Sequence, residues 1–203
     1  MTDTQDTPQT TMTNRDKLIQ LLVERSFSRG RFTLASGKTS DFYIDARMTT
    51  MSPEGLSILG PLAIEVIRQA GWNVDSIGGL TLGADPFAYS ISISSNAFPP
   101  LLRAFTVRKE AKTHGQGKLI EGPFRMGDRV VVVEDVITTG SSAMTAISAV
   151  AAAGGFISGV LAVVDRDEGG VNTIQNAGYD VIALTTIREI MLYADDHQTS
   201  ADV

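Results

Sequence analysis

Short apolar segments alternate with segments of helical periodicity from residue 74 onward. The apolar segments are rich in valine, isoleucine and leucine, which favours buried strands. Strands that alternate with helices are typical of a parallel sheet, so the pattern predicts an α/β fold with a central parallel sheet flanked by helices. The predicted strands are residues 74–80, 101–107, 129–135, 159–165 and 181–186, and the clearest helices between them are residues 85–97 and 141–155.

The residues before this region follow a different pattern. "RDKLIQLLVERSF" and "SPEGLSILGPLAIEVIRQAG" predict two helices, and the second should have Ser52 as N-cap, Pro53 at its first position and Gly71 at its end. Between them, "GRFTLASGKTSDFYIDAR" alternates aromatic and polar residues with glycine and serine. This segment predicts short strands or loops and no helix.

The length of 203 residues fits one domain, which we place at residues 14–203. Within it we expect a small N-terminal hood, mainly residues 14–50, on a core of residues 51–203. Residues 1–13 are rich in threonine, glutamine and aspartate, which predicts a disordered tail without the apolar region of a secretory signal. No apolar stretch approaches the roughly 20 residues that span a bilayer, so we expect a cytoplasmic protein without a membrane partner.

Charge and cysteine content restrict the chemistry. The net charge of -6 argues against a general nucleic-acid binder, because that affinity comes largely from Lys and Arg on phosphates. The absence of cysteine excludes disulfides and thiolate chemistry. His114 and His197 are far apart in sequence, which makes a structural zinc site improbable. Any anion-binding site must therefore be confined to a small part of this acidic protein.

The stretch "VVVVEDVITTGSSA" carries the strongest indication of chemistry. Four valines predict a strand buried on both faces, and Glu134 and Asp135 follow at its carboxyl end, where open α/β sheets bind ligands. The next residues would present N–H groups and hydroxyls at the N-terminus of a helix, which predicts a phosphate site. These residues are Thr138, Thr139, Gly140, Ser141 and Ser142. A ribose 5-phosphate suits both features, because its hydroxyls can donate to the acids while its phosphate lies on the turn.

At these residues the sequence resembles the type I phosphoribosyltransferase family, whose signature is four apolar residues, two acids and a Thr/Gly turn. A buried strand followed by an N-capped helix is the alternative, and it explains the valines and Ser141 but not the acid pair. A Walker A loop is excluded at "ASGKTS", because Phe32 stands where its first glycine should be and "DFYID" predicts a strand where a helix is needed.

The segment "RKEAKTHGQGKLIEGPFRMGD" is long, polar and cationic within an acidic chain. By itself it could equally be a solvated loop. Beside a phosphate site, mobile cations that close over a pyrophosphate leaving group become the better interpretation. Its cations are Arg108, Lys109, Lys112, His114 and Lys118, against Glu110.

The first part of this segment, "RKEAKTHGQG", resembles the catalytic loop of orotate phosphoribosyltransferases. "FTLASGKTSDFYIDAR" resembles their hood and "VVDRDEGG" the strand end that contacts orotate, so the resemblance covers nearly the whole chain after the tail. It implies an enzyme of pyrimidine (UMP) biosynthesis that transfers the phosphoribosyl group of 5-phospho-α-D-ribose 1-diphosphate (PRPP) to orotate, giving orotidine 5'-phosphate and diphosphate. It also implies Mg2+ as cofactor and a homodimer that shares its catalytic loop between subunits.

The resemblance also implies a role for individual residues. Those at the pyrophosphate would be Arg108, Lys109, Lys112 and His114. Glu134 and Asp135 would take the ribose hydroxyls, and residues 138–142 would hold the 5-phosphate, with Thr138 also near orotate. The catalytic residues would then be Lys109, Lys112, His114 and Asp135. Whether Lys112 or His114 protonates the diphosphate is left open.

On the orotate side, Arg166 would pair with the carboxylate, while Tyr43 and Ile44 would line the ring. Without the resemblance, Arg166 would be taken for a surface charge at a strand end, because Asp165, Asp167 and Glu168 offer it partners. A phosphoribosyltransferase for another base would need neither Arg166 nor the cationic loop. A regulator that only binds PRPP would normally add a DNA-binding segment, which the sequence does not indicate.

Two positions depart from the family pattern. Ala35 and Gly83 stand where many relatives have lysine, which leaves Lys38 as the nearest cation of the hood. No residue is expected to bind the metal directly, since PRPP would carry the Mg2+. For Asp85 two roles are left open: it holds a water of that ion, or it caps a helix that starts at Pro86.

Overall fold

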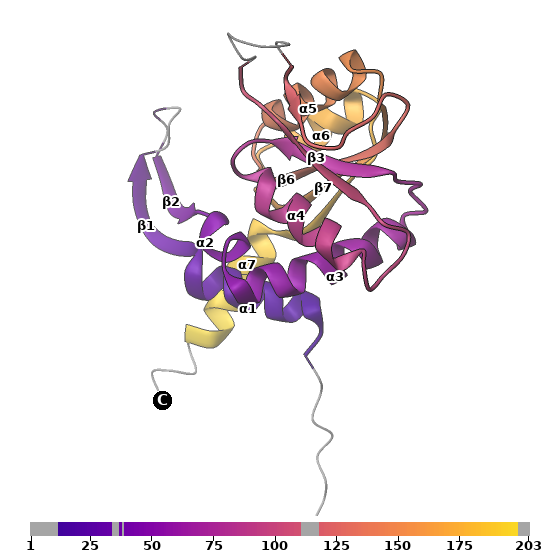
Figure 1. Ribbon diagram of the computed structural model, residues 1–203. Helices are drawn as coiled ribbons and strands as arrows, with labels where there is room; N and C mark the ends of the chain where they lie inside the picture. The colour runs from indigo at the N-terminus through magenta and orange to yellow at the C-terminus, as the bar shows by residue number, and fades with distance from the viewer. Residues whose placement is uncertain (1–11, 34–36, 38, 111–117, 199–203) are drawn as a thin grey trace, which may run out of the picture.

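Figure 1 shows the computed structural model, which describes residues 12–33, 37, 39–110 and 118–198. The helices are α1 (Asn14–Arg25), α2 (Arg47–Thr50), α3 (Pro53–Gln69), α4 (Ala84–Ser94), α5 (Ser141–Ala152), α6 (Gly170–Asn176) and α7 (Ile187–Gln198). The strands are β1 (Phe27–Thr33), β2 (Thr39–Ile44), β3 (Ser76–Leu80), β4 (Arg103–Val107), β5 (Ile120–Glu121), β6 (Arg129–Ile137), β7 (Phe156–Asp165) and β8 (Val181–Thr186).

The main sheet has the strand order β5-β4-β3-β6-β7-β8 within the described residues. All neighbours pair in parallel except β5, which is antiparallel to β4, so the predicted parallel sheet is confirmed. The short edge strand β5 was not predicted. After β3 the chain adds β4 and β5 on one side of β3. It then crosses over and adds β6, β7 and β8 on the other side. The carboxyl ends of β3 and β6 therefore flank the point where an open α/β sheet binds its ligand.

The valines of β6 are buried on both faces of the sheet, as predicted. Val131 and Val133 belong to the core beneath α1, α3, α4 and α7, whereas Val130 and Val132 belong to the core beneath α5 and α6. All four are fully buried. Each such side chain stabilises the fold by about 1.5–3 kcal/mol relative to an exposed one. Figure 1 shows the resulting layers, with α5 and α6 on one face and the other helices on the opposite face.

The capping residues predicted for α3 are confirmed. The Gly55 N–H donates to the Ser52 hydroxyl over 3.1 Å, Pro53 occupies the first turn, and Gly71 follows the helix with φ +70°. Glycine adopts this left-handed conformation without the steric cost of a Cβ. The helix thus begins and ends where local interactions dictate.

The N-terminal hood contains α1, α2 and the antiparallel hairpin β1–β2. The strand β2 stands where a Walker A loop would need a helix, which confirms the exclusion of that motif. Leu18 and Leu22 of α1 join the same core as the sheet. The C-terminal helix α7 packs against α1, which the sequence pattern did not reveal. No helix of the described residues has both the length and the apolar composition that a bilayer crossing requires.

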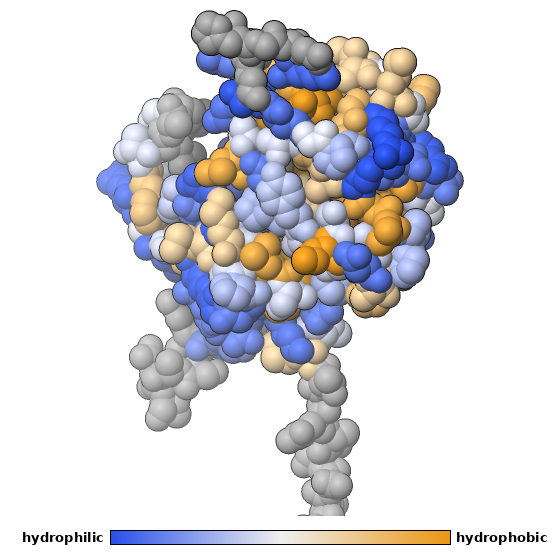
Figure 2. Space-filling model, viewed as in Figure 1, coloured by the Kyte–Doolittle hydropathy of each residue, from blue (hydrophilic) through white to orange (hydrophobic). Residues whose placement is uncertain are grey.

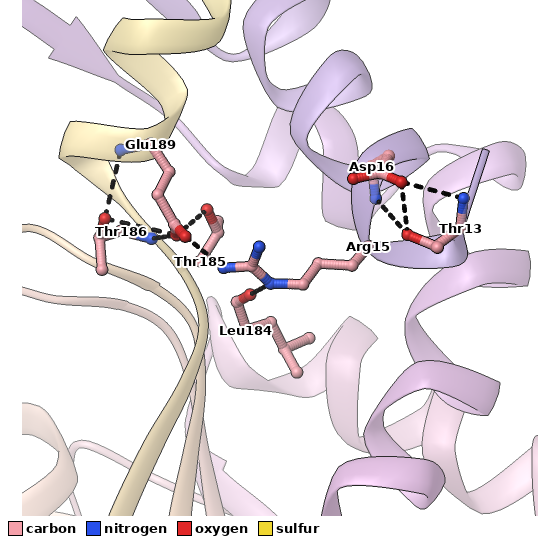
Figure 3. A network of polar contacts seen from close by, with 7 residues as sticks. All are labelled: Thr13, Arg15, Asp16, Leu184, Thr185, Thr186 and Glu189. Atoms are coloured by element: carbon pink, nitrogen blue, oxygen red, sulfur yellow. Dashed lines mark hydrogen bonds and ion pairs between the residues drawn. The ribbon is translucent and has the colours of Figure 1, made fainter. Parts of the chain in front are cut away.

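A polar network joins the two ends of the chain (Figure 3). Arg15 of α1 donates through Nε to the Leu184 carbonyl over 2.9 Å and through Nη2 to Glu189 Oε1 over 2.6 Å. The other Glu189 oxygen accepts from the Thr185 hydroxyl and the Thr186 N–H, each over 2.9 Å. The network fixes α1 against the end of β8 and the start of α7.

Candidate active site

The candidate site lies at the carboxyl ends of β3, β4, β6 and β7, which the parallel register brings to one edge. The Thr81 N–H, just after β3, donates to the Val107 carbonyl at the end of β4 over 2.8 Å. The Arg166 N–H, just after β7, donates to the Ile137 carbonyl at the end of β6 over 2.9 Å. Residues far apart in sequence therefore border one crevice.

The turn of residues 138–142 joins β6 to the N-terminus of α5. Gly140 is the N-cap with φ +83°, and no side chain of the described residues caps the helix. Its backbone packs against Gly170, whose added Cβ would lie 2.7 Å from Gly140 N. Ser141 is the first helical residue, so the alternative in which it merely caps the helix is wrong. The uncapped N–H groups suit an anion.

The acid pair differs in environment. Glu134 is 6% exposed, and its Oε2 has no hydrogen-bond partner among the residues that the structure describes. Burial, followed by the neighbouring Asp135, raises the pKa of Glu134 to about 9. Asp135 is only partly buried, and its Oδ1 accepts from the Val136 N–H over 2.9 Å. Glu134 thus has a raised pKa that favours its protonated form, and one of its two oxygens has no hydrogen-bond partner in the described structure beside a phosphate-type turn.

Arg166 is nearly buried, with 9% of its side chain exposed, so it is not an ordinary surface charge. Its Nε lies 2.9 Å from Glu168 Oε1, but neither Nε nor Nη2 makes a hydrogen bond within the described part of the chain. Its guanidinium carbon lies 5.1 Å from the ring centre of Phe42 in the hood. Unused donors on a buried guanidinium are costly unless a ligand satisfies them, and a carboxylate matches their geometry.

Tyr43 and Ile44 lie on opposite faces of β2. Tyr43 is 42% exposed with its ring 5.5 Å from that of Phe32, whereas Ile44 belongs to the core. That both line the orotate ring stays a prediction, and only one of the two side chains can point toward any given ligand. Phe42, which contacts Arg166, was missed. The period-two alternation of a strand would have placed it on the side of Ile44.

Asp85 is a buried residue in the first turn of α4. It accepts hydrogen bonds from the Thr81 hydroxyl over 2.7 Å and the Thr106 hydroxyl over 2.8 Å. Because α4 begins at Ala84, the expectation that Asp85 caps a helix starting at Pro86 was wrong. The carboxylate instead joins the loop after β3 to β4, and the two threonines were not anticipated.

The cations after β4 are only partly described. The Arg108 Nε–H donates to the Glu110 carbonyl over 3.3 Å, and Arg108 Nη1 lies 3.8 Å from Glu121 Oε1. Lys109 is exposed. The predicted residues Lys38, Lys112 and His114 lie outside the described residues. Where residues are described, no group of three or more His, Cys, Asp or Glu side chains could hold a metal ion.

Arg47 of the hood was not identified from the sequence. It makes two 2.8 Å bonds to the Asp45 carboxylate. Those bonds raise the pKa of Arg47, and the charge of Asp135 adds a smaller contribution. The hood thus brings a cation into electrostatic reach of the acid pair, which no local pattern indicates.

The strand order, the acid pair at the end of β6 and the uncapped turn before α5 together define a type I phosphoribosyltransferase fold, which is also the fold of the structural neighbours. No family model matches the chain. The orotate phosphoribosyltransferase of Rhodopirellula baltica is 41% identical over 185 residues, which cover 88% of this chain and 96% of that protein. That of Aquifex aeolicus is 42% identical over 183 residues, which cover 89% of this chain and 99% of the relative.

Solved structures agree with these relatives. Orotate phosphoribosyltransferase of Mycobacterium tuberculosis, in complex with Fe(III) dicitrate, has a TM-score of 0.78 and 41% identity, covering 87% of this chain and 98% of that chain. The same enzyme in complex with PRPP has a TM-score of 0.73 and 37% identity, with the same coverage. This chain belongs to the orotate phosphoribosyltransferase family.

Proposed function

We propose that this enzyme transfers the phosphoribosyl group of PRPP to orotate, giving orotidine 5'-phosphate and diphosphate for pyrimidine biosynthesis. The observation that carries the proposal is Arg166, a nearly buried guanidinium whose Nη2 has no hydrogen-bond partner among the described residues, and whose backbone bonds the end of the strand that carries the acid pair. Orotate is the pyrimidine base that offers a carboxylate to such a group. The membership in the family and the PRPP complex of a relative support the same reaction.

In the proposed complex the 5-phosphate accepts from the N–H groups and hydroxyls of residues 138–142. Glu134 and Asp135 face the ribose hydroxyls, which gives Glu134 Oε2 its missing partner. Orotate is held by Arg166, with Tyr43 and the backbone of Ile44 beside the ring and Thr138 nearby. The protein therefore orients both substrates, which lowers the entropic part of the barrier.

The reaction needs no protein nucleophile. Orotate N1 gives up its proton and forms the bond to ribose C1 as the bond from C1 to the diphosphate oxygen breaks. The electron pair leaves with the diphosphate, which takes up a proton. Positive charge develops on the ribose and is stabilised by the carboxylate of Asp135. Negative charge develops on the diphosphate, where Arg108, Lys109 and the loop residues Lys112 and His114 would neutralise it.

The residues present fit a role for Mg2+. PRPP would carry the ion, and the partly buried carboxylate of Asp135 supplies negative charge beside it, while Glu134 Oε2 has no hydrogen-bond partner within the described chain. When bound with PRPP, the ion supplies positive charge that stabilises the leaving group. Asp85 already bonds two threonines, so it would reach the ion only through a water molecule.

The substrate is tested by incubating the protein with PRPP, Mg2+ and each of orotate, uracil, hypoxanthine and adenine. Diphosphate release should require Mg2+ and orotate, because only orotate has a carboxylate for Arg166. Equal turnover of uracil or a purine would indicate a phosphoribosyltransferase for another base. Binding of PRPP without turnover of any base would indicate a regulator.

We further propose a homodimer in which each catalytic loop serves the partner's site. Exposed apolar side chains gather on α2, α4 and the loop before α4, and Figure 2 shows hydrophobic atoms over this face. They are Met48, Met51, Leu82, Tyr89 and Ile93. Such a patch is typical of a protein interface, and it adjoins the ends of β3 and β4.

Mixed dimers test the shared loop. Asp135→Asn should lower kcat by at least about tenfold, because the charge that faces the ribose is lost, and Lys112→Ala should also be impaired. A mixed dimer collects both changes in one site and leaves the other intact. Equal amounts give half mixed dimers, so activity should recover to about a quarter of wild type. Recovery no greater than the average of the two variants, after verified subunit exchange, would show that each loop serves its own subunit.

A further inference from the structure

Gly83 has an ordinary backbone conformation at the N-terminus of α4. Its φ and ψ are -62° and -42°, which are right-handed helical values that every L-residue adopts readily. A glycine at such a position costs helix stability relative to alanine. The backbone therefore gives no reason for glycine here.

The surroundings of Gly83 give the reason. A Cβ added at this residue would lie 2.4 Å from Asp135 Oδ1, 2.5 Å from Oδ2 and 2.5 Å from Cγ. These three nearest atoms all belong to one carboxylate, and real Cβ atoms do not approach other atoms so closely. In this chain the carboxylate of Asp135 thus occupies the volume that a Cβ on the Gly83 backbone would fill, an arrangement that must differ in the relatives that have lysine here.

The position of this carboxylate is defined from two sides. On one side Oδ1 accepts from the Val136 N–H over 2.9 Å, and on the other it lies against the Gly83 backbone. Rotation of Asp135 away from Gly83 would break the bond to Val136. The neighbouring buried carboxyl group of Glu134 leaves a charged group little favourable space nearby.

We propose that Gly83 is a positioning residue: by having no side chain, it admits the Asp135 carboxylate to the place from which it faces the ribose. This inference rests on the proposed function for the role of Asp135, but the steric contact itself does not. Gly83 does not touch the reacting atoms and acts only through Asp135. The replacement of lysine by glycine at position 83 therefore helps to determine where the Asp135 carboxylate lies.

Gly83→Ala is the sharpest test, because alanine keeps the backbone conformation and adds one carbon. We expect kcat to fall roughly ten- to hundredfold, the effect of a misplacement of about 1 Å, with the KM for orotate changed by less than about twofold, because Arg166 is untouched. Wild-type kcat in Gly83→Ala would overturn the inference. Wild-type enzyme is assayed first with PRPP and orotate, and its inactivity would overturn the proposed function.

The matched control is the same change in an Asp135→Ala background, where no carboxylate is left to displace. There Gly83→Ala should not reduce the residual kcat further, and a second tenfold loss would overturn the inference. Melting temperatures provide a test that is independent of activity. Alanine should raise the melting temperature more in the Asp135→Ala background than in the wild type, because only the wild type has the clash. If Gly83→Ala alone does not fold, the double variant must fold for the inference to stand.

Discussion

Two glutamates of this protein have opposite environments. Glu189, in the seam between α1 and α7, accepts from Arg15, the Thr185 hydroxyl and the Thr186 N–H. Burial opposes its ionisation, but these bonds lower its pKa. Glu134, at the end of β6, is more deeply buried, has one oxygen without a partner in the described structure, and has its pKa raised to about 9.

The same contrast holds for two arginines. Arg15 uses its guanidinium on the Leu184 carbonyl and the Glu189 carboxylate. Arg166 is nearly buried and forms an ion pair with Glu168, but its Nη2 has no hydrogen-bond partner among the described residues. A polar group that the protein satisfies itself holds the fold together. A buried polar group that the protein leaves unsatisfied lowers stability, and at the end of a parallel sheet it is a candidate for ligand binding. We therefore interpret the seam as structural and the crevice as the proposed active site.

The largest expected effect is that of Arg166→Ala on orotate binding. The KM for orotate should rise roughly ten- to hundredfold, because a charge-assisted hydrogen bond to a carboxylate contributes about 1.5–3 kcal/mol. The KM for PRPP should change little, and the melting temperature should fall only modestly, since in the free protein Arg166 makes one ion pair with Glu168 and one contact with the Phe42 ring. Steady-state kinetics with each substrate varied will measure this. Equal increases of both KM values would mean that Arg166 supports the whole site and does not recognise the base.

The next effect is the pH dependence of stability due to Glu134. In the unfolded chain glutamate ionises near its ordinary pKa, whereas folded Glu134 stays protonated up to about pH 9. Between these values the folded state binds more protons, so its free energy of unfolding should fall as the pH rises, by up to about 1.4 kcal/mol per pH unit. Glu134→Gln keeps a neutral side chain and should flatten this dependence. Urea unfolding at pH 6, 7 and 8 compares the two proteins, and an equal pH dependence of both would contradict the raised pKa of Glu134.

The smallest effect is expected in the seam. Arg15→Ala should lower the free energy of unfolding by about 1 kcal/mol, because the ion pair with Glu189 is partly exposed, while kcat and both KM values stay at wild-type values. The lowered pKa of Glu189 stabilises the fold above its unfolded pKa, and this contribution is lost as the pH falls through the folded pKa. Glu189→Gln should therefore remove stability at pH 7 and change little in acid. If the folded Arg15→Ala variant had a lowered kcat or a raised KM, the distinction between seam and crevice would be wrong.

Features that depend on neighbouring residues were predicted from the sequence. The valines of β6, the capping of α3 by Ser52 and Gly71, and the turn before α5 all lie where the pattern placed them. Each depends on periodicity or on bonds within a few residues. The acid pair and Arg166 were also found, the former from its place after a buried strand and the latter from resemblance.

Features that depend on distant residues were missed. The two-residue strand β5 exists only by pairing with β4, and α7 was not anticipated before its contact with α1 was seen. Asp85 looked like a helix cap because the sequence does not show the threonines that bond it. The contact of Phe42 with Arg166 needed the hood to lie over the end of β7.

The sequence by itself determined the parallel sheet, its buried central strand, and the acids and small residues at the carboxyl end of that strand. Hydrophobic periodicity, capping and turn chemistry act over a few residues, so they can be recognised along the chain. Only the tertiary structure decided which charged side chains have partners within the described protein and which do not. Arg15 and Glu189 are 174 positions apart, and Gly83 meets the carboxylate of Asp135 only when β3 and β6 pair. The burial of a charged side chain and its hydrogen-bond partners are set when distant segments pack together. Two side chains of the same type can therefore have opposite environments.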